Sequence, residues 1–398
     1  MVLTLGAVLG SADAQPGGFV RAKGKDLVGP DGRPLFLRGI NLGNWFEPEG
    51  YMFLFEHGPQ SPREIEDFFS ELIGPEEAEG FWDEYRKAYI TAADIDFVRR
   101  CGFNSVRIPL HWKFFVSGGK GFELLDPIVA ACRSANIFVI LDMHCAPGGQ
   151  TGTNIDDSYG YPWLFESART QQKLIDTWAS IANHYRDERI ILGYDLLNEP
   201  IPHFPQLRIY NSRLEPLYKR VTQAIRRVDP HHVVILGGAQ WDTNFKIFGP
   251  PFDDNLLYQL HKYWMTPDQG SIQEYVDFRE RYNVPIWLGE SGENTDDWIR
   301  QFRTLLEQNK IGWCFWPYKK MVKSSCVVSV REPEGWNEVV QLGAMAAGTG
   351  NAEKRIASRP SVSQSRAVLR GLLEKVRLQQ CQVNAGYLQA LGIKPASL

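Results

Sequence analysis

The segment Ile190-Ile-Leu-Gly-Tyr-Asp-Leu-Leu-Asn-Glu-Pro200 is the most informative part of this sequence. It starts as a short apolar run, broken only by Gly193 and Asp195, of the length typical of a buried parallel strand. Pro200 has no amide hydrogen for a strand ladder, so the strand should give way to a loop at Glu199. A helix cap or a salt bridge at the rim would also explain a single glutamate there.

A second segment has the same design. Pro285-Ile-Trp-Leu-Gly-Glu-Ser-Gly292 is again an apolar strand, and it again places a glutamate, Glu290, at the strand's end. Two buried strands that both end in an acid are hard to explain by packing or by separate surface salt bridges. The pair therefore favours chemistry at the strand ends.

Strand-like and helical patterns alternate along the chain. The eight strand-like stretches are Leu35–Asn41, Asn104–Pro109, Ile137–Met143, Ile191–Asn198, Val233–Gly237, Leu256–His261, Pro285–Glu290 and Gly312–Trp316. Helical patterns between them include Ala168–Tyr185, Leu214–Val228, Gln273–Tyr282 and Thr295–Gln308. This order predicts an α/β fold, a single (β/α)8 barrel. A doubly wound sheet is the alternative, but no GxGxxG or GxxxxGK[ST] turn follows any strand.

Further elements are predicted around the barrel. Helices should begin at a Thr91–Asp94 cap and at Asp126-Pro127, where proline suits the first helical position. Phe19–Leu37 should form an N-terminal β-hairpin that turns at Gly29-Pro-Asp-Gly32. The strand-to-helix loops are enlarged: Glu47–Ala93 should be loop plus helices, Met321–Ser358 a loop excursion on the catalytic side, and Val362–Gln379 the final helix.

Composition and charge narrow the class of protein. A chain of 398 residues with a net charge of −4 carries no basic field, so we expect neither a nucleic acid nor a membrane as partner. Residues 1–14 resemble the remnant of a signal peptide, which predicts a secreted or periplasmic protein. Residues 15–398 should then form one catalytic domain. Six cysteines without a CxxC motif are expected as buried thiols, with a disulfide at Cys326 or Cys381 as the alternative.

The strand ends supply a set of polar and aromatic residues, and in a (β/α)8 barrel such ends form the active site. They are Arg107, His144, Asn198, Glu199, His261, Tyr263, Glu290 and Trp316. Two carboxyl groups suit glycosidic bond cleavage, in which one is protonated and the other ionised. Arg107 would keep Glu290 charged, and Asn198 would bond the 2-hydroxyl of the sugar.

This set resembles glycoside hydrolase family 5, the cellulase family, from Arg38-Gly-Ile-Asn41 through to Trp316. The resemblance implies that Glu199 is the acid/base and Glu290 the nucleophile. The other six residues of the set then match the family's remaining active-site positions, and neither a metal nor a cofactor is expected. The family is retaining, which predicts carboxyl groups about 5–5.5 Å apart.

Finer motifs point to one branch of that family. Asn41-Leu-Gly-Asn-Trp-Phe-Glu-Pro48, Phe81-Trp-Asp-Glu-Tyr85 and Ala146-Pro-Gly-Gly-Gln-Thr-Gly152 look like exo-β-1,3-glucanases. That resemblance implies hydrolysis of β-glucans or gluco-oligosaccharides from the chain end, with endo-β-1,4-glucanase activity as the alternative. Side chains considered for further sugar contacts are Trp45, Trp112, Trp163, Trp241, Trp264, Glu47, Asp156 and Asp157, each with a core or surface role as the competing interpretation.

Two other classes of function remain to be compared. A carbohydrate-binding barrel without catalysis would lack one of the two glutamates, and both are present. A zinc hydrolase would have to use His231-His232, His144 and His261, but no HExxH or HxH spacing supports it.

Overall fold

Eight parallel strands close into a barrel in this computed structural model, which describes residues 18–116, 119–321, 323–345 and 349–398. Each strand pairs with the next along the chain, and the last pairs with the first. The strands are β3 (Arg38–Asn41), β4 (Ser105–His111), β5 (Phe138–Cys145), β6 (Ile191–Asp195), β7 (Val233–Gly237), β8 (Leu256–His261), β9 (Ile286–Glu290) and β10 (Gly312–Phe315). The predicted (β/α)8 barrel and its eight strands are confirmed, although β6 ends at Asp195, before Asn198.

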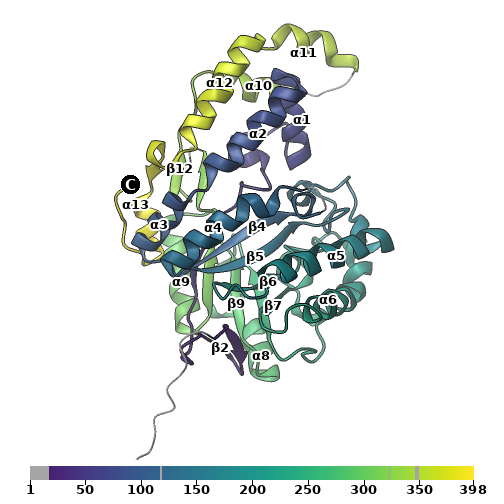
Figure 1. Ribbon diagram of the computed structural model, residues 1–398, viewed down its shortest axis with the longest axis vertical. Helices are drawn as coiled ribbons and strands as arrows, with labels where there is room; N and C mark the ends of the chain where they lie inside the picture. Colours follow the sequence, from purple (N-terminus) through teal and green to yellow (C-terminus); the bar gives the residue numbers. More distant parts are fainter. Residues whose placement is uncertain (1–17, 117–118, 322, 346–348) are drawn as a thin grey trace, which may run out of the picture.

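Helices follow the strands around the outside of the barrel (Figure 1). They are α3 (Ala92–Cys101), α4 (Gly121–Ala135), α5 (Ala168–Tyr185), α6 (Asn211–Arg226), α8 (Gln273–Tyr282) and α9 (Asp296–Gln308). The four-residue element α7 (Ala239–Asp242), after β7, is a turn with non-helical backbone angles at Gln240 and Trp241. The start of α3 is the predicted capping box of Thr91 and Asp94. The start predicted at Asp126-Pro127 is wrong, because α4 begins at Gly121 and carries Pro127 in its interior at the loss of one backbone hydrogen bond.

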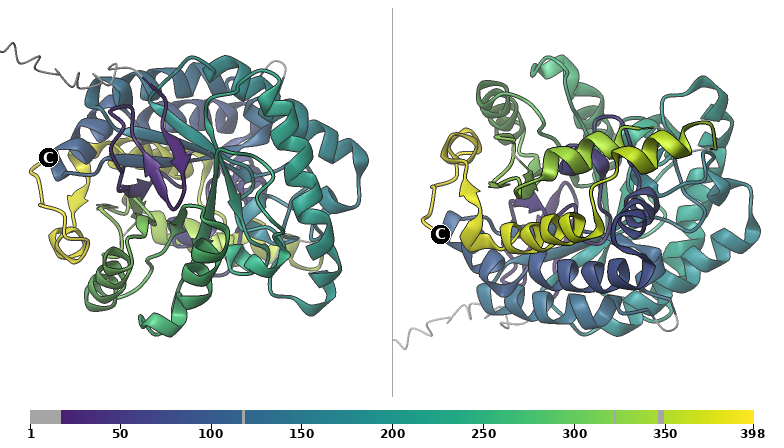
Figure 2. Two further views of the ribbon diagram at one scale, coloured as in Figure 1. Left: turned by 90° about the horizontal axis from the view of Figure 1, so that it is seen from below. Right: turned by 90° about the horizontal axis from the view of Figure 1, so that it is seen from above.

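A second layer of helices covers the carboxyl end of the barrel (Figures 1 and 2). It is formed by α1 (Pro62–Ile73), α2 (Pro75–Tyr89), α10 (Trp336–Gly343), α11 (Ala352–Ser358) and α12 (Val362–Lys375), and we call it the helical cap. The indole of Trp336 donates a hydrogen bond to the carbonyl of Phe53, 2.9 Å away, and thereby ties the cap to the loop that follows β3. The helices predicted within Glu47–Ala93 are confirmed.

The region predicted as a loop excursion, Met321–Ser358, is instead largely structured. Besides α10 and α11 it contains β12 (Val328–Val330), which pairs with β11 (Lys319–Met321) and with β13 (Gln382–Val383) in a small sheet. The prediction was wrong because the apolar face of α10 is packed by distant parts of the chain, and its composition alone does not reveal that face. The helix predicted as the last one ends at Lys375, and α13 (Ala385–Ala390) follows it.

The N-terminal hairpin lies at the opposite end of the barrel from the cap (Figure 1). Its strands are β1 (Arg21–Lys23) and β2 (Asp26–Val28), so the chain reverses at Gly24, whose φ of +58° suits glycine. The hairpin is thus confirmed, but the turn predicted at Gly29–Gly32 comes after β2. There the Gly32 amide donates to the Gly29 carbonyl at 2.9 Å, and Val28 forms a single bridge with Pro34.

The core is continuous from the barrel into the helical cap, with residues of both in one hydrophobic cluster. All six cysteines are buried free thiols, which confirms that expectation over the alternative of a disulfide at Cys326 or Cys381. Among the described residues, no helix combines the length and apolar character that a membrane span requires. The predicted signal-peptide remnant, residues 1–14, lies outside the described part of the chain.

Candidate active site

A cavity of about 940 Å³ opens at the carboxyl ends of the barrel strands. Six of the eight predicted residues line it: His144, Glu199, His261, Tyr263, Glu290 and Trp316. The other two, Arg107 and Asn198, lie directly behind this lining and hydrogen-bond to it. The structure thus brings all eight predicted residues together, because the ends of neighbouring parallel strands share one rim.

Arg107, on β4, is the hub of the site and is fully buried. Its Nη1 lies 2.5 Å from Oε1 of Glu290, and its Nε donates to Asp195 at 2.8 Å. Its Nη2 donates to the Asn198 side-chain oxygen at 2.9 Å and lies 3.0 Å from an oxygen of Asp142. Because the guanidinium fork is filled on every side, its geometry and charge are fixed before any substrate enters.

Glu290 ends β9 and is held as a hydrogen-bond acceptor. Besides the Arg107 contact at Oε1, the Tyr263 hydroxyl donates to its Oε2 at 3.0 Å. Both carboxyl oxygens therefore accept hydrogen bonds, which fix the orientation of the group.

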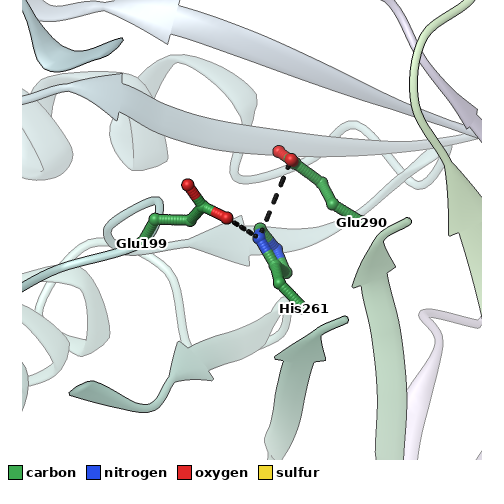
Figure 3. A group of neighbouring side chains, drawn as sticks. All are labelled: Glu199, His261 and Glu290. Atoms are coloured by element: carbon green, nitrogen blue, oxygen red, sulfur yellow. Dashed lines mark hydrogen bonds and ion pairs between the residues drawn. The ribbon is translucent and has the colours of Figure 1, made fainter. Parts of the chain in front are cut away.

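Glu199 has the contrasting environment, since no arginine or lysine among the described residues contacts its carboxyl group. Burial raises the pKa of Glu199 to about 7, although His144, in its protonated form, and Arg107 oppose this rise. Its Oε1 lies 3.0 Å from Nδ1 of His261, as Figure 3 shows. Burial also lowers the pKa of His261 to about 3, so the partner is a neutral imidazole. Near neutral pH a large fraction of Glu199 is therefore protonated.

The two carboxyl groups lie close together. One oxygen of Glu199, one oxygen of Glu290 and a ring nitrogen of His261 all lie within 4.8 Å of one another (Figure 3). Among the described residues this is the one group of three such donors that could hold a metal ion. Its donors are already engaged with one another and with Arg107 and Tyr263. His231 and His232, which a zinc hydrolase would have to use, lie elsewhere, against Phe19 and Asp229.

His144 and Asn198 form a fixed pair beside the acids. Nδ1 of His144 lies 2.8 Å from Asp142, and its Nε2 lies 3.3 Å from the amide nitrogen of Asn198. Burial lowers the pKa of His144 to about 4, so this ring is neutral too. The Asn198 oxygen accepts from Arg107, which turns its NH2 group away from Arg107. The Trp316 ring stacks on His144 at 5.6 Å.

Four further residues of one cavity wall were missed by sequence reasoning. Glu49, Tyr51 and Glu293 line the cavity, and Lys320 pairs with Glu293 at 2.5 Å. Tyr51 accepts a hydrogen bond of 2.6 Å from the Trp316 indole and donates to Glu293 at 3.2 Å. Burial, followed by the charges of Glu290 and Glu199, raises the pKa of Glu49 well above its ordinary value. The sequence feature that could have identified Glu49 and Tyr51 is their position in the loop that follows the first barrel strand, because such loops border the active site.

Glu47, the acid considered on that loop for a sugar contact, is not a cavity residue. It is fully buried, and its Oε1 accepts from the Asn44 amide at 2.7 Å. The surface salt bridge expected as its alternative is also wrong. Asp156 is buried as well and accepts from the backbone of Thr151 and Ser158. Asp157 lies 3.2 Å from His111 of β4 and accepts from the backbone amide of Arg63 in α1 at 3.0 Å. Asp156 thus organises its own loop, whereas Asp157 joins that loop to β4 and α1.

The tryptophans considered as sugar platforms divide into two groups. Trp241 and Trp264 line the cavity, and Trp264 is 73% exposed. Trp45 is a core residue whose indole donates to the Arg86 carbonyl at 2.7 Å. Trp112 packs against the core, and Trp163, like Trp112, is outside the cavity lining. Two of the five tryptophans are thus placed to meet a ligand.

Comparison with known proteins gives the following. A model of the cellulase family (glycosyl hydrolase family 5) matches residues 70–321. The β-xylosidase of Phanerodontia chrysosporium is 28% identical over 345 residues, which cover 76% of this chain and 71% of that protein. Endoglucanase C of Acetivibrio thermocellus is 24% identical over 310 residues, 61% of this chain and 87% of its own. The probable glucan 1,3-beta-glucosidase A of Aspergillus clavatus is 26% identical over 245 residues, which cover 58% of this chain and 56% of that protein.

Solved structures agree on the fold. A rutinosidase from Aspergillus niger, 19% identical, superposes with a TM-score of 0.60 over 73% of this chain and 92% of its own. An endogalactoceramidase, 17% identical, gives a TM-score of 0.62 over 95% of this chain and 86% of that chain.

Proposed function

This chain belongs to the cellulase family, glycosyl hydrolase family 5, and on that premise we propose that it is a retaining β-glycosidase that releases sugar from the ends of β-glucans or gluco-oligosaccharides. Glu199 is the acid/base and Glu290 the nucleophile. The observation that carries the proposal is the unequal environment of two neighbouring carboxyl groups. Arg107 pairs with Glu290, whereas burial raises the pKa of Glu199 to about 7.

The reaction proceeds by two displacements. Glu290 attacks the anomeric carbon and forms an ester bond with it, while the glycosidic C–O bond breaks and Glu199 gives its proton to the leaving oxygen. Water then attacks the same carbon, gives a proton to Glu199, and releases Glu290 as a carboxylate. Tyr263 and Arg107 donate to Glu290 when it is charged, and so stabilise it as a leaving group in the second step.

The retaining outcome is favoured by the separation of the carboxyl groups. Their nearest oxygens lie within 4.8 Å, whereas an inverting enzyme needs about 6.5–9.5 Å to seat a water molecule between acid and base. Proton NMR of the first product formed tests this proposal. The β-anomer is expected, and initial release of the α-anomer would contradict it.

The remaining predicted residues bind the reacting sugar. The NH2 group of Asn198 is directed by the bond that its oxygen accepts from Arg107, which suits a hydrogen bond to the sugar 2-hydroxyl. His144, His261 and Trp316 surround the same space. The neutral imidazoles bind without adding charge next to Glu199.

Action at a chain end is supported by the wall formed by Glu49, Tyr51, Glu293 and Trp316. These residues put carboxyl and hydroxyl groups at one side of the cavity, where they can bond the free hydroxyls of a terminal sugar. Glucan 1,3-beta-glucosidases are among the relatives. The second candidate is an endo-β-1,4-glucanase, which the match to most of the length of endoglucanase C favours.

Product analysis on laminarin, barley mixed-linkage glucan and carboxymethyl cellulose separates the two candidates. Steady glucose release from laminarin with little loss of viscosity is expected. A rapid fall in viscosity of either other polymer, with little free glucose, would overturn chain-end action in favour of the endoglucanase.

Export to the periplasm or out of the cell is also part of the proposal and rests on residues 1–14. N-terminal mass analysis of the protein recovered from its source tests it. A mature chain that begins after Ala14 is expected, and retention of residues 1–14 inside the cell would contradict export.

A further inference from the structure

Three consecutive residues after β7 adopt a backbone conformation that L-amino acids avoid. Gln240, Trp241 and Asp242 have φ angles of +54°, +60° and +57°. None of them is glycine, and a left-handed run of this kind is unfavourable because Cβ approaches the following carbonyl oxygen. Such a segment persists only where its surroundings fix it, and it is a reason to look for a function there.

The surroundings do fix this run. The Gln240 side chain accepts from the amides of Asn211, at 3.1 Å, and Asn244, at 2.7 Å, and it donates back to Asn211 at 2.8 Å. The Asn244 backbone amide donates to the Ala239 carbonyl at 2.8 Å and closes the turn. The run is therefore a rigid support.

The side chain that this support presents is the carboxyl group of Asp242, which is fully buried. Its Oδ2 accepts a hydrogen bond of 3.1 Å from the backbone amide of Glu199 and lies 3.4 Å from Nε2 of His261. His261 in turn places its Nδ1 3.0 Å from the Glu199 carboxyl group. Asp242 thus contacts both the backbone of Glu199 and the ring that touches its side chain.

Glu199 needs such a support, because its own φ is +46°. The hydrogen bond at its amide holds this conformation and therefore the direction in which its side chain leaves the backbone. The neighbouring chain leaves room for the carboxyl group of Asp242. A Cβ at Gly237 would lie only 2.0 Å from Oδ1 of Asp242.

We propose that Asp242 is a positioning residue that holds Glu199, directly and through His261, in the orientation required for proton transfer to the leaving group. The inference rests on the proposed function of Glu199 as the acid/base. It assigns a purpose to the left-handed run, whose rigidity is transmitted to the acid through two contacts.

The groups around Asp242 bear on its charge. They are Glu199, Asp195, Arg107, His261, Tyr218 and Tyr275. Burial, followed by Asp195 and Glu199, raises the pKa of Asp242 well above its ordinary value, whereas the Glu199 amide and Arg107 oppose this rise. A neutral Asp242 has nearly the shape and charge of asparagine, so Asp242→Asn should preserve its role.

The test compares kcat/KM on laminaribiose, whose leaving group needs a proton, with kcat/KM on 2,4-dinitrophenyl β-glucoside, whose leaving group does not. The ratio of the two values, measured in one preparation, does not depend on the fraction of enzyme that is folded. For Asp242→Ala we expect the ratio to fall by about 10- to 100-fold, because a small misplacement of the acid slows proton transfer. Asp242→Asn should keep the wild-type ratio.

Two further variants complete the design. Gly237→Ala displaces the Asp242 carboxyl group without removing it, so it should lower the ratio even if Asp242→Ala does not fold. Asp229→Ala is the matched control, since Asp229 is also buried but pairs with His232 away from the cavity, and it should leave the ratio unchanged.

The outcomes separate this inference from the function on which it rests. Two outcomes would overturn the positioning role, provided that Glu199→Ala lowers the ratio. One is a wild-type ratio in both Asp242→Ala and Gly237→Ala. The other is a ratio in Asp242→Asn as low as that in Asp242→Ala. If Glu199→Ala itself leaves the ratio unchanged, the assignment of the acid falls first.

Discussion

Glu199 and Glu290 lie in one cavity with oxygens within 4.8 Å, yet only Glu290 contacts a cation, Arg107, at 2.5 Å. Two like charges at this distance repel, so a cation beside one of them makes their protonation unequal. In the proposed mechanism this asymmetry divides the chemistry: Glu199, which has no cation beside it, gives the proton, and Glu290 attacks.

Glu290→Ala should abolish turnover of all β-glucosides, on the order of 10⁴- to 10⁶-fold in kcat, because no other group can form the covalent intermediate. The melting temperature should not fall, since the variant removes a carboxylate that Arg107 shares with Asp142 and Asp195. Glu280→Ala, at an exposed pair with Lys25, is the control. Near-normal activity in Glu290→Ala would mean that the nucleophile is another residue.

The pH dependence of kcat/KM should show a basic limb near pH 7, because Glu199 must be protonated and burial raises its pKa to about 7. Activity should fall as the pH rises through that value. In Glu199→Gln this limb should disappear from the residual activity on 2,4-dinitrophenyl β-glucoside. An unchanged limb in the variant would assign the titration to another group.

The raised pKa of Glu199 also lowers the stability of the folded protein at high pH. The folded state binds the Glu199 proton more tightly than the unfolded chain, so ionisation destabilises the fold as the pH rises from about 4.5 through 7. At pH 8, Glu199→Gln should therefore be more stable than the wild type by up to roughly 3 kcal/mol, at about 1.4 kcal/mol per pH unit. Urea unfolding at pH 8 and pH 4 measures the difference in unfolding free energy between the variant and the wild type. An equal difference at both pH values would contradict the prediction.

Arg107→Lys should lower kcat/KM by roughly 100-fold or more, although the positive charge is kept. A lysine cannot bond Glu290, Asp195 and Asn198 at once, so the nucleophile and the amide would lose their fixed positions. Arg226→Lys, which alters a two-bond pair with Asp253 outside the cavity, is the matched control. Equal kinetics in both variants would show that Arg107 supplies charge alone.

Asp94→Ala should destabilise the protein by about 3–5 kcal/mol, because it leaves the buried ammonium group of Lys319 without a carboxylate. The two groups are fully buried and 2.8 Å apart. Lys319→Met in addition should recover part of the loss. Chemical denaturation of the single and double variants measures this, and a double variant no more stable than Asp94→Ala would contradict the account.

The barrel and most of the site could be predicted because both follow from local pattern. Buried parallel strands are apolar runs, and the residues that end them must meet at one rim. That rule placed Arg107, His144 and Tyr263 beside the two glutamates. The same rule says nothing about residues that reach the cavity from loops, which is why Glu49 and Tyr51 were missed and Glu47 was considered instead.

Asp242 could not be predicted for a different reason. It enters the site through a left-handed run, and side-chain networks fix this run against backbone preference. The helix α10 was missed because its apolar residues, Trp336, Val339 and Leu342, contact partners far away in the sequence. A helix of eight residues is too short for its apolar residues to show a recognisable helical period, so the sequence alone does not reveal it.

The helical cap joins parts of the chain that are made at very different times. Arg355 of α11 binds Glu71 of α1, which lies 284 positions earlier in the sequence. During synthesis, α1 and α2 therefore leave the ribosome before α10, whose Trp336 completes the packing around Phe69 of α1. The helical cap is therefore completed last, and until then part of its apolar surface is open to contact with other nascent chains.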